Sequence, residues 1–187
     1  MKYLAGPFAA LLLSGVASAA AIHGPLHIDE AHSRAEFGVR LLWVTKVTGV
    51  FERIRGTIDI DPDDNRAVVQ ASIDVESLQM DSSRFRKWVL APEFFDYTRY
   101  PSIGFVSTRI PLDALGNGDR LDGQLTMRGV TQPVHFTILR SDCTATHLSG
   151  CTLQALGAID RTDFDMRGRR GALADRVELG LSITIGP

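Results

Sequence analysis

Two groups of side chains in this 187-residue chain could take part in catalysis. Ser33 directly follows His32, a pair that could supply a nucleophile and its base, and the segment Asp160–Asp165 gathers three carboxylates around Arg161. Adjacent residues of a strand point to opposite faces, so His32 cannot readily activate Ser33. We favour a structural role for both groups, with Arg161 and Asp163 as an ion pair that anchors a loop. A hydrolase that combines His32 with the carboxylates of Asp160–Asp165 is the catalytic alternative.

The first 21 residues have the composition of a secretory signal peptide. Lys2 precedes an uncharged apolar run, and small residues then offer a cleavage site near Ala19 or Ala21. The run is too short to span a bilayer, although a retained membrane anchor is the alternative interpretation. The sequence therefore predicts a signal peptide at 1–21 and a mature domain at 22–187. We expect this domain in the periplasm or secreted, without stable membrane insertion.

Export favours a disulfide as the interpretation of the two cysteines. Cys143 and Cys151 flank a polar, loop-like segment, and in an oxidising compartment such a pair is expected to bond. The small ring would stabilise the fold by about 2–3 kcal/mol. A metal site would need more ligands at close spacing, and Pro25 lies between His23 and His27. The sequence therefore predicts a structural disulfide, no metal site and no catalytic cofactor.

The composition argues against a nucleic-acid partner and for one soluble domain. The net charge is −2 and only 7% of the residues are aromatic, so neither a broad basic field nor a base-stacking surface is expected. A hydrophobic content of 44% with 22% charged residues is ordinary for a globular protein. The length suits a single domain with a sizeable core.

A hydrophobic period of two runs through most of the mature chain and predicts β-strands. It is clearest in RVELGLSITI at 176–185, where one face carries Val177, Leu179, Leu181, Ile183 and Ile185. Counting 26–44 as one strand and 47–60 as the next gives about eight strands, separated by turn residues. One short helix is expected over Ser82–Leu90, with Asp81 as its N-cap and Pro92 beyond its end.

One short helix cannot cover eight half-apolar strands, so the sheet must cover itself. Antiparallel strands joined by short turns can close into a barrel, and a two-sheet sandwich is the alternative. The interior of an eight-stranded barrel is either filled by its own side chains or open to one small ligand. Several expected inward positions are small, which leaves room for a guest but also suits bulges and corners: Gly56, Ala67, Ala71, Gly123, Ala155 and Gly157.

Four segments, in order along the chain, resemble the YceI-like, polyisoprenoid-binding family. The first, 27–61, has the D-x-x-HS pattern and a later G-x-F, and the second, 93–108, has FFD followed by YP. The third, 121–136, has G-x-LT-x-x-GVT-x-PV, and the fourth, 159–166, has R-x-DF-x-M, although the family usually has glycine at the position of Asp165. The resemblance implies an exported, all-β, lipocalin-like antiparallel barrel that holds an isoprenoid or quinone-like lipid and is not an enzyme.

The strand pattern and the resemblance together predict a binding site of two parts. The expected lumen-facing residues are Phe37, Val39, Leu41, Phe105, Leu125, Phe136, Val177, Leu179, Leu181 and Ile183. Cations of two irregular segments could meet a phosphate-bearing headgroup at one rim, or could be solvated surface: Arg84, Arg86 and Lys87 on the expected helix, and Arg167 and Arg169. The other interpretations left open are a homodimer and a self-filled barrel that docks other proteins.

Overall fold

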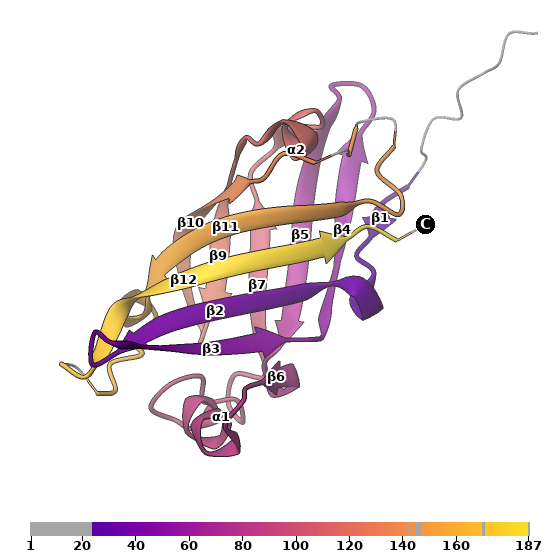
Figure 1. Ribbon diagram of the computed structural model, residues 1–187. Coiled ribbons are helices and arrows are strands. Elements are labelled where there is room, and N and C mark those ends of the chain that lie inside the picture. Colours follow the sequence, from indigo (N-terminus) through magenta and orange to yellow (C-terminus); the bar gives the residue numbers. More distant parts are fainter. Residues whose placement is uncertain (1–23, 142, 145–146, 170, 187) are drawn as a thin grey trace, which may run out of the picture.

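In the computed structural model the chain forms one curled antiparallel β-sheet with few helices (Figure 1). The structure describes residues 24–141, 143–144, 147–169 and 171–186. The predicted signal peptide at 1–21 lies outside these residues, as does His23.

The sheet contains twelve strands, of which three, β1, β6 and β8, are only two residues long. Their bounds are β1 Leu26–His27, β2 Arg34–Leu41, β3 Thr45–Phe51, β4 Ile54–Asp61, β5 Arg66–Asp74, β6 Leu78–Gln79, β7 Ser102–Ser107, β8 Ile110–Pro111, β9 Arg120–Met127, β10 Val130–Ile138, β11 Thr152–Asp160 and β12 Leu173–Thr184. The hydrogen-bonded order is β1-β4-β5-β7-β9-β10-β11-β12-β2-β3-β6, with β8 on β5. In Figure 1, β12, β2 and β3 pass across β4 and β5 behind them, so the sheet curls around an interior.

The predicted count of eight strands is wrong, because two long predicted strands are interrupted and the two-residue strands β6 and β8 were not predicted. Within 26–44, the Asp29 carboxylate accepts the Ala31 N–H at 2.9 Å and caps the 3₁₀ helix η1, Glu30–His32, which separates β1 from β2. Within 47–60, the chain turns a corner between β3 and β4. The Ser77 hydroxyl accepts the two N–H groups exposed by this corner, at 3.2 and 3.1 Å, and so takes the place of ladder partners.

The helical segments are short and lie at the ends of the sheet. Helix α1 spans Ser83–Leu90, close to the prediction, but its N-cap is Ser82, whose hydroxyl accepts the Phe85 N–H at 3.3 Å, rather than Asp81. A further helix that the sequence did not predict, α2, spans Ala114–Asn117. The 3₁₀ helix η2 spans Val75–Ser77, and η3 spans Arg161–Phe164.

The His32-Ser33 pair, which directly precedes β2, is hydrogen-bonded to the last residue of β12. The Ser33 hydroxyl accepts the Thr184 N–H at 3.0 Å, and the Thr184 hydroxyl donates to the His32 carbonyl oxygen at 3.0 Å. Ser33 is buried. The His32-Ser33 pair therefore fastens the start of β2 to the end of β12, which is the structural role expected from the sequence.

Candidate functional site

The interior of the curled sheet contains an apolar cavity of about 180 Å³. On the same measure one water molecule needs roughly 10–15 Å³, and cavities with apolar walls stay dry. Residues at both ends of β12, Leu173 and Ile183, line the cavity. Since a strand rises about 3.3 Å per residue, the cavity extends roughly 30 Å along β12. Its shape is therefore long and narrow.

The structure places nine of the ten predicted lumen-facing residues on the wall of this cavity. They are Phe37, Val39, Phe105, Leu125, Phe136, Val177, Leu179, Leu181 and Ile183. The tenth, Leu41, does not line it, because at the end of β2 its side chain packs against the neighbouring cluster that contains Val39, Val47 and Leu173. On β12, Leu181 pairs in register with Ala155 on one side and Ala35 on the other, so its own side chain projects beyond theirs.

An aromatic cluster forms one wall of the cavity, and its members come from the family motifs. Phe37 lies across Gly49, where a Cβ would stand 2.5 Å from the ring. The rings of Phe51 and Phe95 then stack edge-to-face with centroids 5.5 Å apart, and Phe37 lies 5.9 Å from Phe51. Gly49-Val50-Phe51 is the G-x-F of the first motif and Phe95 belongs to FFD. These motif residues therefore shape the cavity wall.

A second pair of rings accounts for two of the small inward residues. The Phe105 ring lies 2.5 Å from the Cβ position of Gly123, and the Phe136 ring lies 2.7 Å from that of Gly157. The two rings meet edge-to-face at 5.5 Å. Small inward residues can leave room for a guest, but the space beside these two glycines is filled by the rings. The absence of a Cβ at each glycine leaves the space that the neighbouring ring occupies, so each ring packs directly against the glycine backbone.

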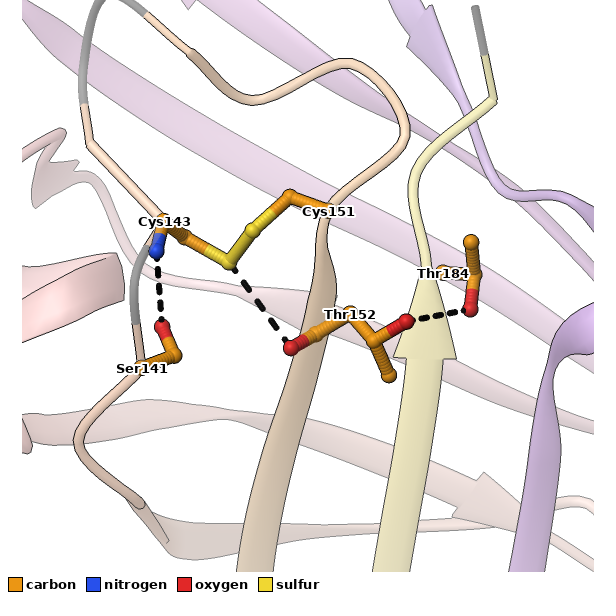
Figure 2. The surroundings of a disulfide bond; sticks show 5 residues. All are labelled: Ser141, Cys143, Cys151, Thr152 and Thr184. Atoms are coloured by element: carbon orange, nitrogen blue, oxygen red, sulfur yellow. Dashed lines mark hydrogen bonds between the residues drawn. A yellow bond between two sulfur atoms is a disulfide. The ribbon is translucent and has the colours of Figure 1, made fainter.

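Fully buried side chains and a disulfide lie next to Ile183, at one end of the cavity. Cys143 and Cys151 form the predicted disulfide, with Cα atoms 5.8 Å apart (Figure 2). Ile185 N–H donates to the Cys151 carbonyl oxygen at 2.8 Å, and Leu148 and Ile185 have no exposed surface. The Thr152 hydroxyl lies 2.8 Å from that of Thr184, near the disulfide (Figure 2).

The opposite end of the cavity carries its unpaired polar atom. Trp88 of α1 lines the cavity, and its indole Nε1 is buried without a hydrogen-bond acceptor in the described part of the chain. Phe94 packs edge-to-face on the Trp88 ring at 4.6 Å, and the Arg169 guanidinium lies over the same ring at 4.8 Å. This end, which we call the α1 end, therefore combines a free N–H donor with a nearby cation.

The predicted headgroup cations have different surroundings. Arg169 meets α1 through Trp88, so the segment after η3 and the helix do lie together. Arg86 donates to the carbonyl oxygens of Leu78 at 2.6 Å and Glu76 at 2.7 Å, and so fastens α1 to the preceding chain. Arg84 and Lys87 are exposed on the helix, and exposed Arg167 pairs with Asp165 at 3.2 Å. Arg169 is thus the cation with a direct contact to a cavity residue.

Arg161 also lines the cavity, but its donors are occupied. It is 2% exposed, and its guanidinium donates to the carbonyl oxygens of Met166, Gly168, Leu173 and Ala174. The fifth N–H bonds the Asp175 carboxylate at 2.7 Å. All five N–H groups of the guanidinium are used. Arg161 is therefore a loop anchor, as expected, but its acidic partner is Asp175 rather than the predicted Asp163.

The structure does not bring His32 together with the carboxylates of the proposed hydrolase. His32 lies beside Thr184 at one end of β12, whereas Asp160 pairs with Arg176 near the other end. These positions are eight residues, roughly 25 Å, apart along the strand. The His32 ring instead bonds the Asp29 carboxylate at 2.7 Å, and this hydrogen bond lowers the pKa of Asp29. His32 therefore bonds a carboxylate three residues away in the sequence and does not meet those of Asp160–Asp165.

The described residues contain neither a candidate metal site nor a candidate membrane-spanning helix. No three His, Cys, Asp or Glu side chains gather there in a way that could hold a metal ion. No helix in the same ranges is long and apolar enough to cross a membrane.

Sequence reasoning missed four aromatic residues of the cavity. Phe51, Phe94 and Phe95 line it, although they entered the sequence analysis only as letters of the G-x-F and FFD motifs. Trp88 lies within the predicted helix, but it was not predicted to line the cavity or to have an unpaired N–H donor. The signal that could have identified all four is the clustering of aromatic residues in the family motifs and on the helix between them.

Comparisons with known proteins agree with this geometry. Residues 26–185 match the model of the YceI-like domain. The chain is 27% identical over 188 residues to "Protein YceI" of Shigella flexneri, covering 97% of this chain and 96% of that one. Solved structures that are similar include BcnA of Burkholderia cenocepacia, with a TM-score of 0.64 and 23% identity over 83% of this chain and 98% of that one. A polyisoprenoid binding domain from Saccharophagus degradans has a TM-score of 0.61 and 15% identity, covering 84% and 95%.

Proposed function

The chain belongs to the YceI-like domain family, and we propose that it is an exported lipid-binding protein that holds a long-chain isoprenoid in the cavity of its sheet. The observation that carries the proposal is the cavity itself, long, narrow and lined almost entirely by apolar side chains from Leu173 to Ile183. Each methylene transferred from water into such a site contributes about 0.8 kcal/mol, so a long chain binds without many polar contacts. The protein sequesters or carries its guest and performs no chemistry on it.

Two observations support an isoprenoid as the class of guest. A domain of the same fold from Saccharophagus degradans is a polyisoprenoid binding domain. The wall of this cavity is irregular, because the flat rings of Phe37, Phe105 and Phe136 alternate with short side chains such as Ala35 and Ala155. Such a wall offers recesses for the methyl branches of an isoprenoid chain.

The unpaired indole of Trp88 supports one orientation of the guest. A buried N–H without an acceptor costs about 1–3 kcal/mol, and a ligand oxygen at the α1 end would remove that cost. The Arg169 guanidinium nearby favours the same oxygen-rich end. At the other end Ile183 lines the cavity, and the buried Ile185 and the disulfide lie next to it, so the surroundings there are apolar. We therefore place the tail toward Ile183 and a quinone, hydroxyl or phosphate oxygen near Trp88.

Mass spectrometry of the lipid that copurifies with the protein tests the proposal. The protein is exported from a bacterial host and purified without detergent, and its intact mass then also reports whether residues 1–21 are removed. An isoprenoid with an oxygen-bearing end, bound one per chain, is the expected result. Protein that carries no lipid and takes up none from a mixture of isoprenoids would contradict the binding function.

A single substitution tests the orientation separately. Trp88→Phe keeps an aromatic ring but removes the N–H donor. It should therefore lower the affinity for an isoprenoid quinone by about tenfold, the effect of one buried hydrogen bond. The hydrocarbon of the same chain length, without the quinone oxygens, serves as the matched ligand and should bind both proteins equally. Equal loss for the two ligands would mean that Trp88 acts only through packing.

A further inference from the structure

The turn between β2 and β3 carries the most exposed apolar group of the described residues. Leu42, Trp43 and Val44 are 62%, 74% and 85% exposed. They follow each other directly at the tip of the hairpin between β2 and β3. Isolated exposed apolar residues are common on proteins, but three large ones in a row at a tip suggest a surface that meets an apolar partner.

Turn chemistry does not account for these residues. Leu42 and Trp43 both have positive φ angles, 49° and 63°, a conformation that bulky residues avoid and that Asn-Gly usually provides in a two-residue hairpin turn. The corresponding turn between β9 and β10 uses Arg128-Gly129, with glycine at the second position. Because the backbone is strained and the side chains contact little, folding alone does not select leucine and tryptophan here.

The tip lies at the α1 end of the cavity. The Leu42 N–H donates to the Ala172 carbonyl oxygen at 2.7 Å, and Leu41, directly before it, pairs in register with Leu173. Leu173 lines the cavity and belongs to the same apolar cluster as Trp88. The exposed tip and the free donor of Trp88 are therefore at the same end of the molecule.

Basic residues stand directly below the apolar tip on both strands. Arg40 on β2 and Lys46 on β3 face each other in register, and both are exposed. Lys46 pairs with Glu178 at 2.7 Å, which leaves Arg40 with no ion pair among the described residues. An apolar tip above a basic pair matches the boundary of a bilayer, where tryptophan lies among headgroups and cations meet lipid phosphates.

We propose that Leu42-Trp43-Val44 inserts into the surface of a lipid bilayer and sets the α1 end of the cavity against it. The docking itself needs only the exposed tip, whereas its role in passing a lipid between bilayer and cavity rests on the proposed function. The partner is a bilayer rather than a protein pocket because the three apolar residues stand at the tip of a hairpin, with Arg40 and Lys46 directly below them.

The turn offers a variant that separates docking from folding. Leu42→Asn with Trp43→Gly installs the sequence that this turn conformation prefers, so the variant should unfold at a temperature equal to or above that of the parent. Its binding to vesicles of phosphatidylethanolamine and phosphatidylglycerol, measured by flotation, should fall at least tenfold. If that variant unfolds early, Trp43→Asn alone provides the same comparison, because asparagine tolerates positive φ.

Two exposed apolar residues elsewhere give the matched control. Leu156 on β11 and Val106 on β7 are 54% and 48% exposed, and Leu156→Thr with Val106→Thr should leave flotation unchanged. Parent and variants share the same N-terminus, so differences between them belong to the substitutions. Flotation that is equal in the parent and the tip variant would overturn the proposal. A parent that is dimeric without vesicles and becomes monomeric on removing the tip would also overturn it, since the tip would then cover a second copy.

Discussion

Adjacent residues of β12 should respond in opposite ways to the same substitution. Leu181 faces the cavity between two alanines, whereas Ser182 faces outward between Arg34 and Gln154. Leu181→Phe and Ser182→Phe introduce the same side chain one position apart. If the cavity holds a lipid, only the first should reduce binding.

The expected size of the effect follows from the displaced hydrocarbon. Phenylalanine has three more side-chain carbons than leucine, and at position 181 these carbons enter the space that a guest would fill. Displacing about three methylenes at about 0.8 kcal/mol each costs about 2.4 kcal/mol, which is roughly fiftyfold in affinity. The cost to folding should stay below about 1.5 kcal/mol, because the cavity gives the ring room. Ser182→Phe should change affinity by less than about threefold.

Competition against a fluorescent isoprenoid, over a series of chain lengths, measures the difference. Leu181→Phe should lose affinity most for chains that fill the parent cavity and least for short chains that leave space unfilled. Thermal unfolding of both variants checks that each is folded. Equal affinities for the two folded variants at every length would refute the assignment of the β12 apolar face to a ligand cavity.

Three further predictions concern the framework around the cavity. Arg161→Gln should destabilise the fold by about 3 kcal/mol or more in denaturant unfolding, because four backbone carbonyls lose their donor; an unchanged midpoint would contradict the anchoring role. Replacing both Cys143 and Cys151 with alanine should cost about 2–3 kcal/mol in the same assay, and reduction of the parent should cost as much. Lys46 lowers the pKa of Glu178 through a hydrogen bond and its charge, so Lys46→Met should raise that pKa toward its ordinary value. Because a lowered carboxyl pKa adds stability that is lost as the pH falls through it, the parent's advantage over Lys46→Met should shrink in acid, and a constant difference would argue against the pair.

Much of the fold was predictable because it depends on local alternation. The period of two in β12 placed Val177 and Leu179 on the wall of the cavity, and the spacing of the cysteines with expected export predicted the disulfide. Helix α1 was predicted to within one residue at its start. These features need only neighbours in the sequence, or a covalent bond whose two ends are close along the chain.

The errors came from contacts between distant parts of the chain. The corner between β3 and β4 depends on the hydroxyl of Ser77, which lies more than twenty residues away in the sequence. Arg161 pairs with Asp175 rather than with Asp163, which is nearer in the sequence, because the chain after η3 folds back and brings β12 to the guanidinium. Trp43 continued the alternating apolar pattern of β2, so the pattern concealed the turn that Leu42 and Trp43 form.

The cavity itself illustrates why a strand pattern alone could not decide between a filled and an open interior. Glycines at inward positions were compatible with empty space, yet Gly49, Gly123 and Gly157 each have an aromatic ring from a neighbouring strand at their Cβ position. The rings occupy the space next to the glycines that a side chain would otherwise fill. Replacing any of these glycines with alanine would push a ring toward the lumen. Cross-strand register therefore determines whether a small residue opens the interior, and register is set by the pairing of the whole sheet.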